Sequence, residues 1–470
     1  MAAPSFFVLD LALPMLRKTL IPLLPLLAVA LLAAERPADL SEAGSWLQGY
    51  LRIDTTNPPG QEHRAAAYLA DILRKEGIPV HIARTASGRA SLWARLSSPR
   101  SNGRALILLH HMDVVSPGPG WTVPPFAGEV RDGRLWGRGA MDDKSLGIAE
   151  LAAFVDLKRR HAAIERDVIY LAVADEENGG IEGTSWLLEH RPEMFAGAEA
   201  VLGEGGRAQT ANGRLLWWGI EVAQKRPLWL EVSASGRGGH ASGLNPESAT
   251  HQLVEGLARM LQRPARWRVT PAARQYAHAI APLHNDHWKR ILSGIDGFVK
   301  PEGPTEFLLP GMANLFLDTV QVTVLRGGER INVVPEHASA LVDVRLLPDT
   351  DAQAFLAGLE ESLGKGFDVK VLVTSPPVPP SPASGRLYES LERALAPDGP
   401  VVPTFVPGFT DSRYFRERRI PAYGVTPFAV GGDDLKGIHG PDERIPIDEL
   451  DRGVERMRRV VAAWAGAPEG

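Results

Sequence analysis

The sequence predicts an α/β protein: a larger domain with a mostly parallel sheet flanked by helices, and an inserted α+β domain with an antiparallel sheet. Short runs of apolar residues at 105–109, 168–174 and 200–203 alternate with helical patterns in the first half of the chain. The middle of the chain instead alternates apolar and polar residues. Continuous apolar runs are typical of parallel strands buried on both faces, whereas period-two alternation indicates half-exposed antiparallel strands.

The larger domain is expected over residues 35–222 and 346–470. Helices are predicted at 41–52, 63–76 and 145–160, and in the last of these Ile148, Leu151, Ala152 and Val155 recur at helical spacing. After the insertion, a helix at 352–363, a strand at 369–373 and a proline-rich link at 376–382 indicate that the α/β pattern returns. Strands separated by helices predict βαβ units.

The inserted domain is expected over residues 223–345. Leu228, Leu230 and Val232 alternate with polar neighbours, and so do the apolar residues around 322–324 and 341–344. A helix at 246–261 is expected to cover one face of the resulting sheet.

The N-terminal segment, residues 1–34, has the layout of a secretory signal. Arg17 and Lys18 precede an apolar stretch that ends on the small residues Ala33 and Ala34. The apolar stretch is short for a membrane-spanning helix, although an uncleaved N-terminal anchor remains the alternative. Met15 is an alternative start of the chain. We therefore expect an exported protein, periplasmic or secreted, that associates with a membrane only if this segment is not cleaved.

Composition excludes several classes of function. The chain has 470 residues, a formal net charge of −5 and no cysteine. The missing cysteines rule out disulfide staples, thiolate catalysis and cysteine-ligated metals. The near-neutral charge gives no electrostatic footprint for nucleic acid, so no nucleic-acid partner is expected.

Polar residues follow each of the three apolar runs. They are His111 and Asp113 in L-L-H-H-M-D-V (108–114), Glu176 and Glu177 in V-A-D-E-E-N-G-G (173–180), and Glu204 in V-L-G-E-G-G (201–206). Ligands of open α/β sheets bind beyond the carboxyl ends of the strands, which is where these side chains are expected. Taken singly, each has an ordinary alternative as a satisfied polar contact or a surface charge.

Two further candidates lie in glycine-rich loops. Asp142 stands in W-G-R-G-A-M-D-D-K (136–144), where it could simply cap the next helix, and His439 stands in K-G-I-H-G-P-D-E (436–443). Together the motifs supply two histidines and several carboxylates, the ligand set expected for a pair of Zn²⁺ ions or similar divalent metals. Of two adjacent glutamates, one can bind metal while the other acts as general base.

The ordered set of motifs resembles the di-zinc metallopeptidase family of carboxypeptidase S, glutamate carboxypeptidase, aminoacylase and succinyl-diaminopimelate desuccinylase, over nearly the whole chain after residue 40. The resemblance implies two Zn²⁺ per chain, with Co²⁺ or Mn²⁺ as possible substitutes. It implies these roles: His111 and Glu204 on one zinc, Glu177 and His439 on the other, Asp142 bridging, Glu176 as general acid/base and Asp113 orienting His111. It also implies a cis peptide between Asp142 and Asp143.

The same resemblance extends to the inserted domain. His240 in G-R-G-G-H-A-S (236–242) resembles a histidine that stabilises the oxyanion across a dimer, which implies a homodimer formed through the inserted domain. Asn332 and Arg345 resemble residues that bind the substrate carboxylate. Thr410 lies in G-F-T-D-S-R (408–413), which resembles G-G-T-D-S with Phe409 in place of the second glycine. A turn residue for His240 and an exposed strand charge for Arg345 are the alternatives.

The function implied is zinc-dependent hydrolysis of an amide or peptide bond next to a free carboxylate, in a small peptide or an N-acyl amino acid. Carboxypeptidase, dipeptidase and N-acyl amino acid hydrolase activities all fit, and the motif wording is closest to carboxypeptidase S-like members. The alternatives are a catalytically inactive binding relative of the same fold and a periplasmic solute-binding protein.

Overall fold

The computed structural model describes residues 40–467. The expected signal or anchor segment, residues 1–34, lies outside the described residues. Within the described part, none of the helices combines the length and apolarity that a membrane crossing needs.

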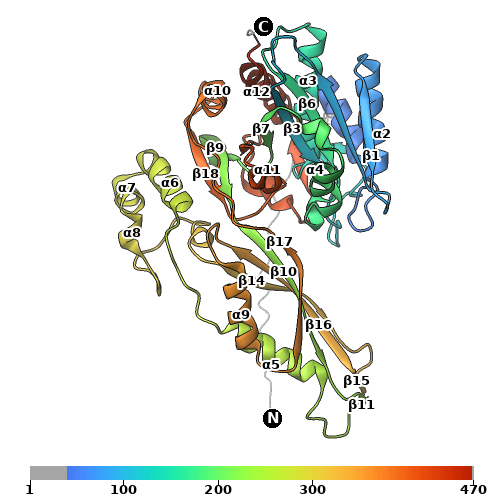
Figure 1. Ribbon diagram of the computed structural model, residues 1–470, viewed down its shortest axis with the longest axis vertical. Helices are drawn as coiled ribbons and strands as arrows, with labels where there is room; N and C mark the ends of the chain where they lie inside the picture. Colours follow the sequence, from blue (N-terminus) through green and yellow to red (C-terminus); the bar gives the residue numbers. More distant parts are fainter. Residues whose placement is uncertain (1–39, 468–470) are drawn as a thin grey trace, which may run out of the picture. The chain divides into compact units, whose positions relative to one another are not determined.

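A large mixed sheet organises most of the described chain (Figure 1). In spatial order its strands are β1 (Val80–Arg84), β2 (Ala90–Leu96), β6 (Asp167–Val173), β3 (Ala105–His111), β7 (Ala198–Gly203), β19 (Ala422–Gly424), β9 (Arg214–Gln224) and β18 (Val401–Val406), with β8 (Ala208–Ala211) paired to β9. The pairs β6–β3, β3–β7, β7–β19 and β9–β18 are parallel. The predicted fold class is confirmed.

Helices cover both faces of this sheet, which explains why its central strands are continuous apolar runs. In β3, Leu106 and Leu108 pack into one core while Ala105, Ile107 and Leu109 pack into another. The first core includes α1 (Glu42–Leu51), α2 (Glu62–Lys75), α3 (Lys144–Arg159), α10 (Arg386–Leu395) and α12 (Ile447–Ala465). The second includes α4 (Trp186–His190) and α11 (Ser412–Glu417). The alternating side chains of one strand therefore serve two layers.

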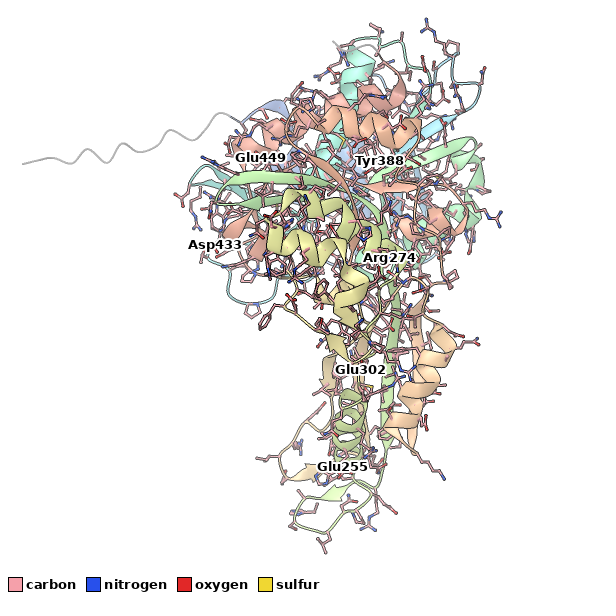
Figure 2. The ribbon with its side chains drawn as sticks, turned by 90° about the vertical axis from the view of Figure 1, so that its left-hand side faces the viewer. Glu255, Arg274, Glu302, Tyr388, Asp433 and Glu449 are labelled. Atoms are coloured by element: carbon pink, nitrogen blue, oxygen red, sulfur yellow. The ribbon has the colours of Figure 1, made fainter. Side chains whose placement is uncertain are left out.

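A second, antiparallel sheet continues from the first, because β9 runs almost directly into β10 (Arg226–Ser235). Its strand order is β14 (Thr319–Arg326), β16 (His337–Leu346), β10 and β17 (Phe367–Thr374). Two helices pack on one face, α5 (Ala249–Leu261) and α9 (Ala352–Leu363). We call this unit the small sheet. Figure 2 marks α5 by Glu255, and α10 and α12 of the large core by Tyr388 and Glu449.

The expected boundaries of the insertion, 223 and 345, differ from the sheets that form. The helix at 352–363 and the strand at 369–373, which we assigned to the larger domain, belong to the small sheet, where β17 pairs with β10. Conversely, α6 (Pro271–Ile280), α7 (Asp286–Ser293) and α8 (Ile295–Phe298) contribute buried residues to the core of the large sheet. The chain thus crosses between the two sheets more often than its patterns reveal.

Short elements complete the structure and position the site. β4 (Glu129–Arg131), β5 (Arg134–Trp136) and β20 (Arg444–Pro446) form a three-stranded sheet in which Arg444 pairs with Trp136. β11 (Gly239–His240) pairs with β15 (Val333–Val334) beyond the end of β10, and β12 (Val299–Lys300) pairs with β13 (Gly303–Pro304).

Candidate metal centre

Three neighbouring parallel strands deliver the first group of side chains. β3 lies between β6 and β7, and all three end at the same edge of the sheet. His111 is the last residue of β3, Glu204 directly follows β7, and Glu176 and Glu177 follow β6 after a two-residue turn. The strand-end motifs therefore converge, as expected for the carboxyl edge of an open sheet.

The two loop residues are brought together by the pairing of β5 with β20. Because Trp136 pairs with Arg444, the loop that follows β5 lies beside the loop that precedes β20. The first of these loops carries Asp142 and the second carries His439. The expected cis peptide bond joins Asp142 to Asp143. The N-cap of α3 is Asp143, so the capping alternative for Asp142 does not hold.

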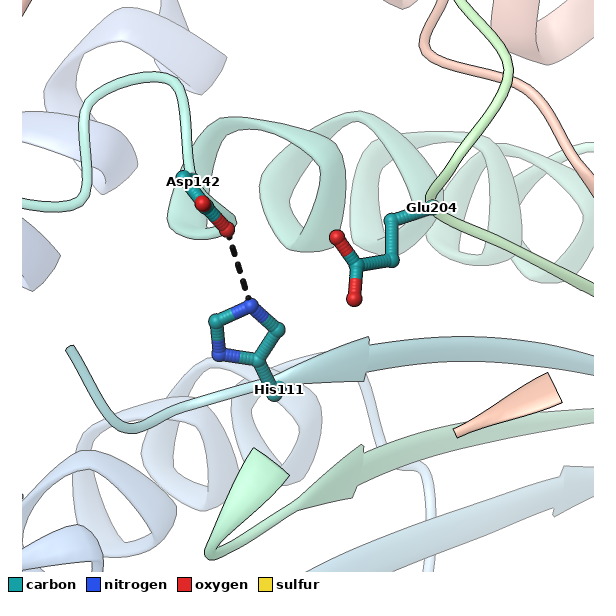
Figure 3. A group of neighbouring side chains, drawn as sticks. All are labelled: His111, Asp142 and Glu204. Atoms are coloured by element: carbon teal, nitrogen blue, oxygen red, sulfur yellow. Dashed lines mark hydrogen bonds and ion pairs between the residues drawn. The ribbon is translucent and has the colours of Figure 1, made fainter. Parts of the chain in front are cut away.

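Five side chains form two donor triplets that share Asp142. The first is His111, Asp142 and Glu204, and the second is Asp142, Glu177 and His439; within each, the ligand atoms lie within 4.8 Å of one another. His111 Nε2 is 3.0 Å from Asp142 Oδ1, with the Glu204 carboxylate facing them (Figure 3). On the other side, His439 Nε2 is 3.1 Å from Asp142 Oδ2 and 3.4 Å from Glu177 Oε2.

The chemistry of these donors fits two divalent cations. Each triplet offers one imidazole nitrogen and two carboxylates, and each Asp142 oxygen faces a different triplet. The buried Glu177 Oε1 accepts no hydrogen bond from any residue in the range 40–467. An unpaired buried oxygen beside a histidine and a second carboxylate is the environment that a hard or borderline cation satisfies.

When no cation is bound, protons on the donor side chains offset the negative charge of the carboxylates. Burial lowers the pKa of His111, but the nearby carboxylates of Asp113 and Asp142 outweigh this and raise the pKa well above its usual range. Hydrogen bonds to Asp142 and Glu177 raise the pKa of His439 to about 10. Burial raises the pKa of Glu204 well above its usual range. Cation binding would displace these protons, since metal ligands bind in their deprotonated forms.

Asp113 organises the site from behind. His111 Nδ1 donates to the backbone carbonyl of Asp113 at 2.9 Å, while the Asp113 carboxylate is farther away, at 3.7 Å. That carboxylate accepts the backbone N–H groups of Glu176 and Glu177, each at 3.1 Å. Asp113 therefore orients His111 mainly through its carbonyl and fixes the turn that carries both glutamates through its side chain.

Glu176 lies buried next to the triplets without belonging to either. With His111, Glu204, Thr410 and Asp411 it lines one narrow cavity. Burial raises the pKa of the Glu176 carboxyl well above its usual range, and the carboxylates of Asp411 and Glu177 raise it further. A carboxyl group with a raised pKa can both accept and return a proton near neutral pH.

Sequence reasoning missed a buried network behind Asp113. The Asn57 amide donates to Asp113 Oδ2 at 2.7 Å, and Arg89 donates to Asn57 Oδ1 at 3.1 Å and to Asp175 Oδ1 at 3.0 Å. Arg89 also forms an ion pair with Glu62. The only sequence signal was the T-T-N-P-P-G segment at 55–60, whose two proline peptide bonds are cis.

It also missed Glu443, four residues after His439. This side chain is fully buried and accepts the backbone N–H groups of Gly139, Met141 and Asp142 at 2.8, 2.7 and 3.0 Å. Arg138 pairs with it at 2.5 Å. Glu443 is the last residue of the K-G-I-H-G-P-D-E motif (436–443) that contains His439, and this position is the sequence signal that points to it.

Thr410 and Arg345 lie where the small sheet meets the large one. Thr410 is buried in the cavity wall, where its hydroxyl donates to Gln224 Oε1 at 3.0 Å. The Arg345 guanidinium forms a bidentate pair with Asp343, at 2.6 and 2.8 Å, and lies 4.4 Å from the ring centre of Phe409. The alternative interpretation of Arg345 as an exposed strand charge is therefore incomplete, because its guanidinium is paired with Asp343 and lies over Phe409.

His240 and Asn332 lie on β11 and directly before β15, at the end of the small sheet far from β3 and the two donor triplets (Figure 1). Both are exposed and lie beyond the end of the ten-residue strand β10, where Ala241 N donates to the Asn332 carbonyl at 3.1 Å. At about 3.3 Å per residue, that strand spans roughly 30 Å. His240 Nδ1 accepts a hydrogen bond from the backbone N–H of Ser242 at 3.2 Å, as expected if His240 is a turn residue that bonds to the local backbone.

Comparison with known proteins agrees with this geometry. Residues 107–463 match peptidase family M20/M25/M40. The chain is 26% identical to aminoacylase-1 of Homo sapiens over 427 residues, 89% of this chain and 94% of that protein. It is 27% identical to the N-fatty-acyl-amino acid synthase/hydrolase PM20D1 of Xenopus tropicalis over 442 residues, 89% of this chain and 85% of that protein.

The fold is similar to that of the M20 family metallo-carboxypeptidase Sso-CP2 from Sulfolobus solfataricus. The TM-score is 0.71 at 19% identity, and the match covers 91% of this chain and all of that one. With the family match and the two donor triplets, this chain belongs to peptidase family M20/M25/M40 and is a metal-dependent hydrolase of amide or peptide bonds.

Proposed function

We propose that the chain hydrolyses an amide bond next to a free carboxylate, in an N-acyl amino acid or a small peptide, with two Zn²⁺ ions bound by the triplets that share Asp142. The observation that carries this proposal is the presence of two complete triplets with Glu176 buried beside them. When bound, two divalent cations polarise a carbonyl group and lower the pKa of a water molecule.

In this proposal Glu176 moves the proton. Its carboxylate accepts a proton from the attacking water and then returns it to the leaving amine nitrogen. The buried position of Glu176 beside both triplets supports both steps, because a base must lie within reach of the proton that it accepts and returns. The Asp113 carboxylate accepts the backbone N–H of Glu176 and so holds Glu176 in the wall of the narrow cavity that His111 and Glu204 also line.

We also propose that the protein works as a homodimer in which His240 reaches the site of the partner subunit. The exposed position of His240, beyond the far end of β10, supports delivery in trans. Large apolar side chains are exposed nearby, with Leu244 at 96% and Ile331 at 103% exposure, and such residues are typical of an interaction surface. An imidazole N–H delivered in this way would stabilise the oxyanion. We further propose that the protein is exported.

A pair of adjacent variants tests the proposed roles. Glu176→Gln should lower kcat about 10²- to 10⁴-fold while two metals stay bound, because the substitution removes the general base and leaves the metal ligands in place. Glu177→Gln should lower metal occupancy. Activity is measured on N-acyl amino acids and dipeptides, with chelator controls, and metal by elemental analysis. Equal loss of metal in both variants would overturn the assignment.

A further inference from the structure

Segment 408–413 reads G-F-T-D-S-R, with Phe409 in the place where the motif that it resembles has a second glycine. Phe409 directly precedes Thr410, which lines the narrow cavity together with Glu176. Gln224 binds Thr410 through three hydrogen bonds: its Oε1 accepts the backbone N–H at 3.2 Å and the hydroxyl at 3.0 Å, and its Nε2 donates to the carbonyl at 3.2 Å. The backbone next to Phe409 is therefore firmly held at the cavity wall.

The Phe409 ring contacts two arginines that belong to different parts of the fold. The Arg345 guanidinium, on β16 of the small sheet, lies 4.4 Å from the ring centre, and the Arg413 guanidinium, on α11, lies 4.5 Å from it. The Trp229 ring of β10 lies beside them, with its centre 5.5 Å from that of Phe409 and 5.8 Å from the Arg345 guanidinium. Phe409 therefore links β16 to α11 through cation–π contacts.

Arg413 anchors one side of this arrangement in the protein interior. Its guanidinium is buried and donates to the backbone carbonyl of Gly179, which ends the turn that begins with Glu176. The Tyr414 ring lies 4.3 Å from the same guanidinium, and the Tyr414 hydroxyl donates to the same carbonyl at 2.5 Å. The Phe409 ring thus rests against a cation that is itself fixed.

Arg345, by contrast, is partly accessible, with 26% of its side chain exposed. Its Nε and Nη2 donate to the Asp343 carboxylate at 2.6 and 2.8 Å, which uses two of the five N–H groups of the guanidinium. Both side chains lie on the face of the small sheet opposite α5 and α9, because the alternate residues Val342 and Val344 pack into the core that these helices cover. Arg345 can therefore hold a substrate anion at the junction of the two sheets.

We propose that Phe409 is a positioning residue that holds the Arg345 guanidinium in the orientation that receives the free carboxylate of the substrate. The inference rests on the proposed function and on the role that the sequence resemblance implies for Arg345. Asp343 holds one edge of the guanidinium and the Phe409 ring supports its face, so the two contacts together set its plane before a substrate arrives. A side chain oriented in advance loses less conformational freedom when the ligand binds.

The test compares N-acetyl-leucine with N-acetyl-leucinamide, which has the same side chain and no carboxylate. Phe409→Leu keeps an apolar side chain but removes the ring. It should lower kcat/KM for N-acetyl-leucine about 2- to 30-fold, the range for loss of a cation–π contact, mainly by raising KM. The value for the amide should stay nearly unchanged, and Phe409→Tyr, which keeps a ring, should retain the wild-type preference.

Phe355→Leu is the matched control. Phe355 lies on α9, where its ring centre is 4.9 Å from the Arg263 guanidinium, so the variant loses the same kind of contact on the helix-covered face of the small sheet. Its preference for the carboxylate should equal that of the wild type.

A double-mutant cycle shows whether Phe409 acts through Arg345. If it does, adding Phe409→Leu to Arg345→Gln should change kcat/KM for N-acetyl-leucine by no more than about twofold, because the residue that Phe409 orients is already gone.

Three results would overturn the proposal. A wild-type preference for the carboxylate in Phe409→Leu would mean that Asp343 alone orients Arg345. An equal loss on both substrates would mean that Phe409 only supports the fold. An additive loss in the double variant would mean that Phe409 acts independently of Arg345.

Calorimetry separates this inference from the proposed function. Zinc-loaded Glu176→Gln protein is titrated with N-acetyl-leucine, with and without Phe409→Leu. We expect the second substitution to weaken binding about 2- to 30-fold. If the wild type hydrolyses no N-acyl amino acid or dipeptide, the proposed function fails, yet binding that depends on Phe409 and not on Phe355 still supports the positioning role. Equal affinity in the two proteins, or binding in neither, rejects it.

Discussion

Replacing Glu443 by glutamine should weaken both the fold and the metal centre. Glu443 and Arg138 are almost completely buried, at 0% and 1% side-chain exposure, and they pair at 2.5 Å. The two Glu443 oxygens accept three backbone N–H groups of the loop that carries Asp142. A glutamine keeps one carbonyl oxygen, but its NH₂ group would face donors from Arg138 and Gly139.

The size of the effect follows from these contacts. Leaving one member of a buried ion pair without its partner costs about 3–5 kcal/mol. The free energy of unfolding of a domain is usually about 5–15 kcal/mol, so the variant should still fold but should unfold at a clearly lower urea concentration than the wild type. Because Glu443 fixes the loop that presents Asp142, which both triplets share, Zn²⁺ affinity should fall about 10- to 100-fold, as for other residues that hold a ligand in place.

Asp167→Asn provides the matched control. Asp167 is also buried, accepts the Ser98 N–H at 2.7 Å and pairs with Arg95 at 2.8 Å. It begins β6, at the opposite end of the strand from the two donor triplets. Urea unfolding and zinc titration are measured on both variants. The control should lose stability and keep its zinc affinity. Wild-type zinc affinity in Glu443→Gln would refute the reasoning.

Three other predictions follow from separate features. Burial lowers the pKa of Lys225 from 10.5 to about 8. Between pH 8 and pH 10.5 the Lys225 amine is therefore protonated in the unfolded chain but not in the folded one, so the free energy of unfolding should rise with pH over this range. Urea unfolding should show that the wild type gains about 3 kcal/mol between pH 8 and 10.5 relative to Lys225→Met. Mixing His240→Ala with Glu176→Gln should restore activity in mixed dimers, and no recovery despite proven subunit exchange would exclude delivery in trans. Protein from a secreting host should begin between about residues 31 and 37 on N-terminal sequencing, whereas retention of Arg17 with membrane association would favour an anchor.

Residues that follow buried strands could be located from the sequence because one rule governs them all. Parallel strands end at a common edge, so the positions after the apolar runs at 105–109, 168–174 and 200–203 had to meet. The loop residues Asp142 and His439 needed the family resemblance, since nothing local indicates that β5 pairs with β20.

Other features depend on contacts that chain order does not encode. β17 joins the small sheet through its pairing with β10, and its alternating pattern fits either sheet equally well. The burial of Arg89 and Arg138 reflects partners that lie 86 and 305 residues away in sequence, Asp175 and Glu443. Their residue types are ordinary on a surface, so composition and spacing give no sign of them.

The number of zinc ions bound per chain tests the central claim most directly. Metal-free protein is loaded with Zn²⁺, freed of excess by dialysis and measured by elemental analysis, for the wild type and for His439→Ala. We expect two equivalents in the wild type and about one in the variant, which keeps the triplet of His111, Asp142 and Glu204 intact. One equivalent or fewer in the wild type would contradict a centre built from two triplets that share Asp142.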